Sequence, residues 1–507
     1  MHARVLSACL TGIEAVLVRV EVDVSHGLPA FTTVGLPDPT IRESRDRVRA
    51  AVRNSGFAVP SDRVTVNLAP ADLRKEGVSF DLPIALGLLA ATGSVKAEAL
   101  ASLLVVGELA LDGAVQPVRG VLPMALAASR AGLTGCLLPP GNAREATVVA
   151  GLTVYPARSL ADAAAFLNGE QAIEPATSEG ERLLPDGATE DFDFADVRGQ
   201  THVKRALEIA AAGGHHVLMI GAPGTGKTML ARRLPTILPP FSLGEALEVS
   251  TIWSVAGLVP TSGLVTERPF RAPHHTISGA GLVGGGRGPQ PGEVSLAHLG
   301  ILFLDELSEF APHVLDTLRQ PLETGAVMLA RAEGRMTLPA GFQLVGAMNP
   351  CRRGCRSRDL CACTPPERAR YLARLSGPFL DRIDVQVEVP PVPYRDLGSE
   401  GASGETSEAI RKRVLAARER QRGRCGRVGS GINRRMTARQ MARWCRLDRD
   451  GRRLMGQAVD RLGLSARAHD RVLKVARTIA DLADAEEMAA EHLAEALQYR
   501  GVEGGED

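Results

Sequence analysis

A glycine-rich stretch of eight residues limits the fold of this 507-residue chain more than any other feature of its sequence. It matches the phosphate-binding pattern GxxxxGK followed by Ser or Thr, and ends at Lys227-Thr228. The apolar run Val217–Ile220 precedes it and helix-forming residues follow it, which is the strand, loop and helix context that the pattern requires. The stretch therefore predicts a parallel α/β sheet with a loop that binds a nucleoside triphosphate.

Each part of this loop has an expected role with ATP and Mg²⁺. Backbone N–H groups can approach the phosphates at the start of the helix because the glycines carry no side chain. Lys227 would hold the β- and γ-phosphates, and the Thr228 hydroxyl would ligate Mg²⁺. The residues expected to bind the nucleotide are Gly221, Ala222, Pro223, Gly224, Thr225, Gly226, Lys227 and Thr228.

Two further apolar runs lead to polar residues, as do strands that bring side chains to a ligand. Ile301–Leu304 is followed by Asp305, expected to hold Mg²⁺ through water, and by Glu306, expected to polarise the attacking water. The run 343–347 leads to Asn349, whose amide could sense the γ-phosphate or orient that water. Taken alone, an asparagine before a proline is more often a helix cap.

Two changes in composition divide the chain. Residues 170–194 form an acidic linker, and residues 391–410 form a second linker rich in Pro, Gly, Ser and Glu. They separate a block of alternating strands and helices, 1–169, from the P-loop block, 195–390, and from a block with helical periodicity only, 411–507. We therefore expect an α+β domain, an α/β ATPase core and a helical lid.

The charge of the chain is balanced overall and uneven locally. Its 59 Lys and Arg against 58 Asp and Glu give a formal net charge of +1, which excludes a uniformly basic nucleic-acid coat. From 411 to 453, however, sixteen basic residues stand against three acidic ones. This segment is either a solvated helical face or a contact with DNA phosphates, which would weaken steeply with salt and show little sequence preference.

The lengths of the apolar runs indicate where in the cell the protein is expected, and that location bears on the role of the cysteines. The longest apolar run, 82–93, is far shorter than the roughly 18–20 residues of a membrane span, so no membrane partner and a cytoplasmic location are expected. In that reducing compartment, closely spaced cysteines indicate a metal rather than disulfides. Cys351, Cys355, Cys361 and Cys363 supply four thiolates, enough for a structural Zn²⁺ site, the alternative being four free thiols in a polar loop.

Six further motifs lie between residues 31 and 384. They are FTTVGLPD from Phe31, VTVNLAPAD from Val64, DLPIA from Asp81, RAPHH from Arg271, GAMNP from Gly346 and GPFLDRID from Gly377. Together with the P-loop they resemble the YifB/ComM family, in the magnesium-chelatase-like branch of AAA+ ATPases. The resemblance implies a homo-hexamer that hydrolyses ATP, and members related to ComM are understood as DNA branch-migration helicases of natural transformation and recombination.

The resemblance also assigns roles to three arginines. Arg382 corresponds to the arginine finger, which stabilises transition-state charge on the ATP of the neighbouring subunit, and Arg467 to the sensor-2 residue of the lid. Segments 270–288 and 324–335 resemble two insertions that line the pore of ring helicases, with Arg331 near the tip of the second, where it would touch DNA phosphates. Taken alone, Arg382 and Arg467 would each more simply form a surface ion pair.

The chain departs from the family patterns in two places. The resemblance implies a Lon-protease-like (ribosomal S5 domain 2-like) fold for residues 1–169, with Ser79 at the position of the nucleophile. Leu122 stands where those peptidases carry their catalytic lysine, so we expect a non-peptidase scaffold or a module that binds DNA or a partner. The family usually carries cysteine pairs of the forms CxCG and CxC, whereas the first pair here, Cys351 and Cys355, is separated by three residues.

Two other functions are alternatives at this point. A chelatase-type motor would remodel a metal-inserting partner protein, although chelatase motors lack the N-terminal Lon-like domain. A protein-remodelling ATPase would use residues 1–169 as a substrate adaptor. Stimulation of the ATPase by DNA would separate a DNA motor from both.

Overall fold

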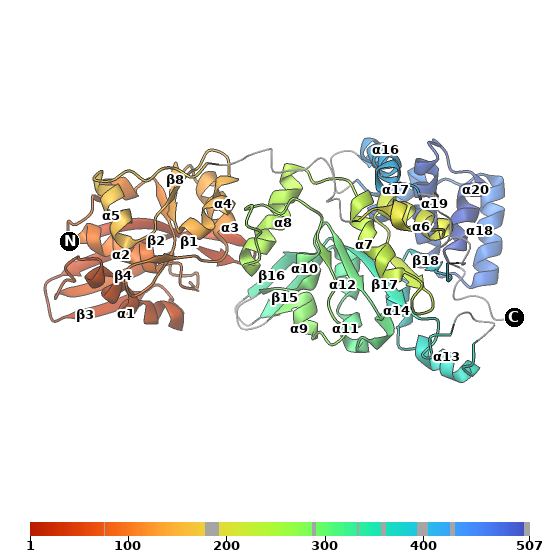
Figure 1. Cartoon of the computed structure of the whole chain (residues 1–507), viewed down its shortest axis with the longest axis horizontal. Coiled ribbons are helices and arrows are strands. Elements are labelled where there is room, and N and C mark those ends of the chain that lie inside the picture. The colour runs from red at the N-terminus through yellow and green to blue at the C-terminus, as the bar shows by residue number, and fades with distance from the viewer. Residues whose placement is uncertain are drawn as a thin grey trace. The chain divides into compact units, whose positions relative to one another are not determined.

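The structure is a computed structural model that describes residues 1–75, 77–177, 192–285, 290–331, 334–355, 361–392, 404–425 and 431–500. The chain forms two compact units (Figure 1). The first unit comprises Met1–Pro185, Ser242–Thr266 and Pro289–Pro291, and the second comprises Asp186–Phe241, Glu267–Gly288 and Gly292–Asp507. Each unit contains its own sheet and its own hydrophobic core.

A seven-stranded mixed sheet forms the centre of the first unit, with the strand order β3-β4-β2-β1-β5-β8-β9. The strands are β1 (His2–Thr11), β2 (Glu14–Ser25), β3 (Ala30–Val34), β4 (Arg63–Ala69), β5 (Leu103–Val105), β8 (Gly135–Leu138) and β9 (Thr153–Pro156). Strand β2 pairs antiparallel with β1 and β4, and the other pairs are parallel. On β2, Val18, Val20, Val22 and Val24 are buried as their alternation predicts, whereas Val16 is 40% exposed.

Helices cover both faces of this sheet. They are α1 (Pro39–Asn54), α2 (Asp81–Ala91), α3 (Val121–Arg130), α4 (Ala143–Thr147) and α5 (Leu160–Asn168), with a short pair of strands, β6 (Glu108–Leu109) and β7 (Val115–Gln116). Leu104 and Val105 of β5 enter different core clusters because successive side chains of a strand point to opposite faces. Asp38 caps the start of helix α1, since its side-chain oxygen accepts a hydrogen bond from the Ile41 backbone N–H.

One helix of the first unit comes from the middle of the sequence. Helix α8 (Leu243–Ala256) follows closely on the P-loop helix, α7 (Lys227–Ile237), yet it packs against α3. The predicted ATPase block 195–390 is thus interrupted, because residues 242–266 fold with the N-terminal unit. Local sequence could not reveal this, since a helical pattern does not identify the surface on which the helix packs.

A buried carboxyl group fixes α8 in the first unit. Glu145 accepts hydrogen bonds from Ser254 Oγ and from Asn142 Nδ2, each at 2.6 Å. The backbone oxygen of Ser254 also accepts a hydrogen bond from the Gly120 N–H at 3.0 Å. Burial raises the pKa of Glu145, and the two side-chain hydrogen bonds oppose that rise.

A five-stranded parallel sheet forms the centre of the second unit, as the P-loop predicts. Its strands, in spatial order, are β11 (Phe270–Arg271), β14 (Ile301–Leu304), β17 (Gln343–Met348), β10 (Val217–Ile220) and β18 (Val385–Glu388). Strand β10 lies between β17 and β18, and β14 pairs with β17. The carboxyl ends of β10, β14 and β17 therefore meet at one edge of the sheet, where parallel sheets bind their ligands.

The remaining described helices of the second unit surround this sheet or form the lid. They are α6 (Thr201–Gly213), α7, α9 (Gly279–Val283), α10 (Glu293–Leu296), α11 (Pro312–Asp316), α12 (Arg319–Thr324), α13 (Pro365–Leu372), α14 (Gly377–Leu380), α16 (Ser407–Cys425), α17 (Ala438–Trp444), α18 (Arg449–Leu462), α19 (Ala466–Leu482) and α20 (Ala490–Gln498). Val217 of β10 and Val472 of α19 belong to one core cluster, so the lid packs on the ATPase sheet. Among the described residues, no helix is long and apolar enough to cross a bilayer.

Candidate nucleotide-binding site

The P-loop joins β10 to α7 through residues that only glycine can occupy. Gly224 and Gly226 have φ values of +79° and +91°, which side chains other than glycine rarely adopt. A Cβ atom on Gly221 would lie 2.4 Å from the backbone oxygen of Val389, closer than any side chain can come. The loop ends at the N-terminus of α7, whose unpaired N–H groups suit a phosphate.

Lys227 lies folded over the loop. Its Nζ donates hydrogen bonds to the backbone oxygens of Gly221, at 2.7 Å, and Ala222, at 2.9 Å, and reaches Asn349 Oδ1 at 3.3 Å. Burial lowers the pKa of Lys227, and the nearby Asp305 opposes this. The predicted phosphate-binding lysine and the side-chain amide of Asn349, which follows β17, are thus in direct contact.

Thr228 and Asp305 connect the P-loop helix to the end of β14. Thr228 Oγ1 donates a hydrogen bond to Asp305 Oδ2 at 2.7 Å, although 77 residues separate them in the sequence. A hydroxyl and a carboxylate oxygen side by side are ligands that Mg²⁺ prefers. The structure therefore brings together four predicted residues, Lys227, Thr228, Asp305 and Asn349, in an arrangement that fits a magnesium–nucleotide complex.

Glu306 follows directly in a strained backbone conformation. Its φ is +50°, which is uncommon outside glycine and asparagine, and its side chain is 62% exposed. His275, beyond the end of β11, places Nδ1 at 3.6 Å from Glu306 Oε2. Sequence reasoning assigned no role to His275, and its only sequence signal is the RAPHH motif.

Arg382 and Arg467, the two arginines to which the family resemblance assigns roles in ATP hydrolysis, lie outside this group of contacts. The side chain of Arg382 is held by Glu323 Oε1 at 2.6 Å and by the backbone oxygen of Arg319 at 3.1 Å, both on α12. Arg467 is exposed in the first turn of α19. Within the described part of the chain, neither arginine forms a hydrogen bond or ion pair with a P-loop residue of its own subunit.

Asp384, two residues after Arg382, is a buried anchor that sequence reasoning missed. Its carboxylate accepts hydrogen bonds from Arg471 Nη1 at 2.9 Å and from the His216 backbone N–H at 3.0 Å. Burial alone raises the pKa of Asp384, but its contact with His215 and the charge of Arg471 hold the pKa well below its usual range. Arg471 lies one turn after Arg467 on α19, so Asp384 connects the loop of Arg382 to the helix of Arg467.

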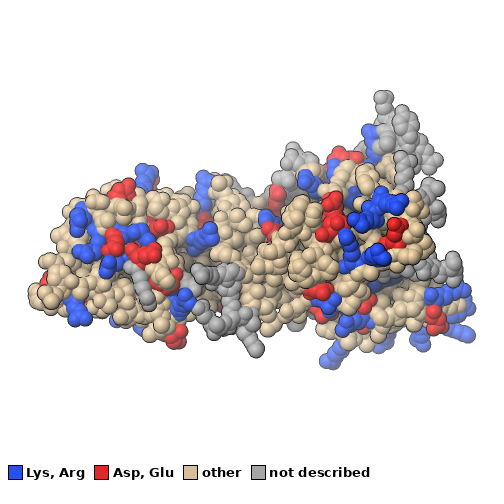
Figure 2. All heavy atoms as spheres, turned by 90° about the horizontal axis from the view of Figure 1, so that it is seen from below, with Lys and Arg blue, Asp and Glu red and all other residues tan. Residues whose placement is uncertain are grey.

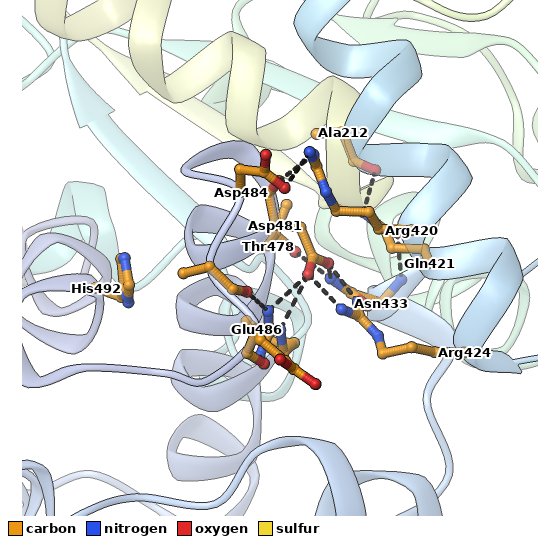
Figure 3. A network of polar contacts seen from close by, with 12 residues as sticks. Ala212, Arg420, Gln421, Arg424, Asn433, Thr478, Asp481, Asp484, Glu486 and His492 are labelled. Carbon is orange, nitrogen blue, oxygen red and sulfur yellow. Dashed lines mark hydrogen bonds and ion pairs between the residues drawn. The ribbon is translucent and has the colours of Figure 1, made fainter.

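The lid contains a second buried polar network, centred on Asp481 (Figure 3). Asp481 is fully buried and accepts hydrogen bonds from Arg424, Arg477 and Asn433 Nδ2. These residues come from α16, from α19 itself and from the turn that precedes α17. The network therefore fixes the lid helices to one another. The guanidinium groups of Arg424 and Arg477 bind the Asp481 carboxylate within the fold.

The four predicted cysteines converge. The Sγ atoms of Cys351, Cys355, Cys361 and Cys363 all lie within 4.8 Å of one another. Four thiolates at about 2.3 Å from a tetrahedral Zn²⁺ are separated by about 3.8 Å, so the observed cluster fits such an ion with small adjustments. The structure thus accommodates the CxxxC spacing of the first pair.

The cysteine loop packs against the nucleotide-binding residues. A Cβ on Gly354 would lie 2.9 Å from Pro223 of the P-loop, so the two loops are in direct contact. Tyr371 of α13, which follows the cysteines, donates a hydrogen bond from its hydroxyl to the Asn349 backbone oxygen at 3.2 Å. The loop therefore supports both the P-loop and the end of β17.

Other predicted features are only partly described. Strands β15 (Ala326–Arg331) and β16 (Gly334–Pro339) form an antiparallel hairpin, which overlaps the second predicted insertion, 324–335. The side chain of Arg331 lies outside the described part of the structure, as do residues 286–288 of the first predicted insertion. Most of the two predicted linkers, 178–191 and 393–403, also lies outside the described residues.

Comparison with known proteins identifies the relatives of this chain. Family models described as "Magnesium chelatase, subunit ChlI", "Subunit ChlI of Mg-chelatase" and "Magnesium chelatase, subunit ChlI C-terminal" match residues 193–397, 20–142 and 404–500. Competence protein ComM of Haemophilus influenzae is 46% identical over 501 residues, which cover 99% of this chain and 97% of that protein. The chain belongs to the YifB/ComM family. A YifB protein of Escherichia coli is 44% identical over 97% of this chain and 96% of its own length.

The chelatases are more distant relatives. The magnesium-chelatase 38 kDa subunit of Rhodobacter capsulatus is 28% identical over 254 residues, 45% of this chain and 69% of that subunit. The YifB/ComM chain thus has a magnesium-chelatase-like AAA+ architecture, with a parallel α/β sheet and a C-terminal helical region. Because a model named for a chelatase subunit also matches residues 20–142, domain order does not by itself separate this family from the chelatases.

Proposed function

We propose that this protein is an ATP-driven ring motor that moves branched or single-stranded DNA, acting as a branch-migration helicase in recombination and natural transformation. The observation that carries the proposal is the contact of Thr228 with Asp305, and of Lys227 with Asn349, at one edge of a parallel sheet. This arrangement supports ATP binding with Mg²⁺ and its hydrolysis. The full-length similarity to a protein named for competence supports DNA as the substrate.

Six residues carry the chemistry of ATP hydrolysis in this proposal. Lys227 neutralises the β- and γ-phosphates, and Thr228 and Asp305 hold Mg²⁺, which offsets the charge that develops on the phosphates. Glu306 orients and polarises the attacking water, and His275 fixes the direction of its carboxylate. Asn349 contacts the γ-phosphate once Lys227 turns from the loop toward the nucleotide.

Hydrolysis in this proposal requires a ring of identical subunits, a hexamer. Arg382 reaches the ATP of the neighbouring subunit, and Arg467 contacts the nucleotide of its own subunit from the lid. The support is that Arg382 contacts α12 and no P-loop residue of its own chain in the described structure. A guanidinium supplied in trans makes the reaction dependent on assembly.

DNA would pass the hairpin of β15 and β16. Arg331 ends β15 and would contact backbone phosphates without reading bases. The first unit would act as a scaffold or a DNA- or partner-binding module of Lon-like fold rather than as a peptidase. In support, Ser79 is buried, with 6% of its surface exposed. The sequence also has Leu122 where the family resemblance implies a lysine base.

The cysteine cluster would hold a structural Zn²⁺ ion. Zinc would fix the loop that contacts Pro223 and, through α13, the end of β17. All four ligand positions would be filled by thiolates, so the ion would have no open position for substrate and no direct part in catalysis. Its role would be to keep the nucleotide-binding loops in place.

The alternative function is a chelatase-type or protein-remodelling ATPase that acts on a partner protein. The similarity to a magnesium-chelatase subunit favours it, although that similarity covers only 45% of this chain. ATPase rates measured with single-stranded DNA, with a four-way junction, and with an unfolded protein separate the two. We expect DNA to raise the rate severalfold and the protein to leave it unchanged; the reverse result would establish the alternative.

A further inference from the structure

Two sets of arginines in the basic segment 411–453 differ in what they contact. The first set is used inside the fold. Arg413 pairs with Glu208 and Glu405, and Arg418 donates to the Ala211 backbone oxygen at 2.6 Å. Arg420 and Arg424 both bind Asp481 in the lid network (Figure 3), and Arg434 donates to the Leu322 backbone oxygen at 3.1 Å. These charges stabilise the lid and are not available to a partner.

The second set is exposed on two consecutive helices and on the loop between them. We call it the α17–α18 arginine surface: Arg439, Arg443, Arg446, Arg449, Arg452 and Arg453. Within the part of the chain that the structure describes, none of these six guanidiniums forms an ion pair. Of the two carboxylates among them, Asp448 caps α18 by accepting a hydrogen bond from the Gly451 N–H, and Asp450 is exposed.

Helical spacing groups these arginines by face. Arg439 and Arg443 are four residues apart on α17, and the three arginines at the start of α18 are spaced so that they share one side of the helix. Arg443 lies over the Trp444 ring at 4.6 Å, and Arg452 Nε donates to the Leu447 backbone oxygen at 3.1 Å. These contacts hold the side-chain stems along the helices. On the face that Figure 2 draws, basic side chains lie at one end of the second unit with acidic side chains among them.

We infer that the α17–α18 arginine surface binds the phosphate backbone of DNA, as a contact separate from the β15–β16 hairpin. The inference rests on the proposed function. Arginines three or four residues apart on one helix lie close together and repel one another unless a polyanion neutralises them. Guanidinium groups match phosphate oxygens with paired hydrogen bonds. The surface offers no fixed pattern of polar groups that distinguishes bases, so it binds DNA independently of sequence.

The test compares two double variants of the full-length protein that lose the same charge. R439Q/R443Q removes two members of the surface, and K412Q/R422Q removes two exposed cations of α16 outside it. Fluorescence anisotropy with a labelled single strand of about 40 nucleotides is recorded over a salt series, with Mg²⁺ and a non-hydrolysable ATP analogue. We expect R439Q/R443Q to weaken binding at least about fivefold and to lower the salt slope by about 1.4, at about 0.7 per phosphate contact. The control variant should bind within about twofold of wild type, and the DNA-free ATPase rate of both should be unchanged.

Three results would overturn the inference. Equal weakening by the two double variants would mean that net charge, and not this surface, determines affinity. An unchanged affinity and salt slope in R439Q/R443Q would place the DNA elsewhere on a protein that still binds it. Competition by poly-glutamate as effective as competition by unlabelled DNA would assign the surface to an acidic protein. Failure of the wild type to bind DNA even at low salt would instead remove the proposed function itself.

Discussion

Single residues far apart in the sequence make the contacts on which the candidate site depends. The motifs predicted the chemistry of Lys227, Thr228 and Asp305, because strand ends and a P-loop define where such side chains lie. They did not predict that Asp384 accepts a hydrogen bond from Arg471, because no local pattern connects residues 87 positions apart. The sequence signal for Asp384 was its place in the same GPFLDRID motif as Arg382.

We predict that Asp384→Asn destabilises the second unit and slows ATP hydrolysis. The substitution leaves Arg471 without its carboxylate partner in a largely buried position, which costs about 3 kcal/mol and lowers the melting temperature by several degrees. Asp381→Asn, three residues away, is the matched control and should leave both unchanged. Differential scanning fluorimetry and ATPase assays check this; equal effects of the two variants would contradict it.

The pH dependence of this pair has a definite sign. The pKa of Asp384 is held well below its usual range, so its contribution to stability is fully present above the unfolded value of about 3.9 and is lost as pH falls through the folded pKa. The stability difference between the wild type and Asp384→Asn should therefore stay constant from pH 5 to 8. It should shrink only in more acidic solution, and a decline near neutral pH would contradict the assignment.

Among structural elements, the positions of the strands could be predicted from the sequence, whereas the surface on which a helix packs could not. Uninterrupted apolar runs identified β10, β14 and β17, since each is a fully or almost fully buried parallel strand. Helix α8 lies 16 residues after the start of α7, and nothing in its pattern shows that it joins the first unit. Its attachment depends on Glu145, which comes from a distant part of the chain.

We predict that Ser254→Ala loosens α8 within the first unit. The change removes a hydrogen bond to the buried Glu145 carboxyl group, at a cost of about 1–3 kcal/mol. Hydrogen exchange followed by mass spectrometry should show faster exchange in residues 243–256 and unchanged exchange in α7. Ser262→Ala should have no such effect, because among the described residues the hydroxyl of Ser262 donates a hydrogen bond only to the nearby Leu264 backbone oxygen. Equal exchange in the two variants would refute the role of Ser254.

The cysteine loop allows a prediction about metal content. Purified protein should contain about one Zn²⁺ per chain, because four thiolates can fill a tetrahedral site. Cys361→Ser with Cys363→Ser should lose the metal and raise the KM for ATP, since the loop supports Pro223. Cys136→Ala, at a buried cysteine outside the cluster, should keep it. Elemental analysis decides this, and metal-free wild-type protein with normal ATP affinity would contradict the zinc proposal.

For the whole molecule, the net charge indicates less about DNA binding than the positions of the charged side chains in the fold. The excess of arginine in 411–453 was visible in the sequence, but the sequence could not show which side chains are internal. Arg424 is bound because Asp481 lies opposite it, 57 residues further along the chain, whereas Arg453 has no such partner among the described residues. Only the fold separates structural arginines from those available to DNA.

Assembly into a ring predicts complementation between inactive subunits. Lys227→Ala and Arg382→Ala should each abolish ATPase activity when alone. In a mixture of equal parts, one interface in four combines an intact Lys227 with an intact Arg382, so about a quarter of the activity should return if the arginine acts in trans. Steady-state ATPase rates after subunit exchange measure this. Activity no greater than the sum of the two variants would place the action of Arg382 within its own subunit.

The most direct test of the central claim is branch migration of a synthetic four-way DNA junction. Wild-type protein with ATP and Mg²⁺ should convert the junction to its duplex products. Lys227→Ala should not do so because it cannot hold the triphosphate, and Glu306→Gln should bind ATP without processing the junction. If wild-type protein hydrolyses ATP at a rate that DNA does not change and leaves the junction intact, this protein is not a DNA branch-migration motor.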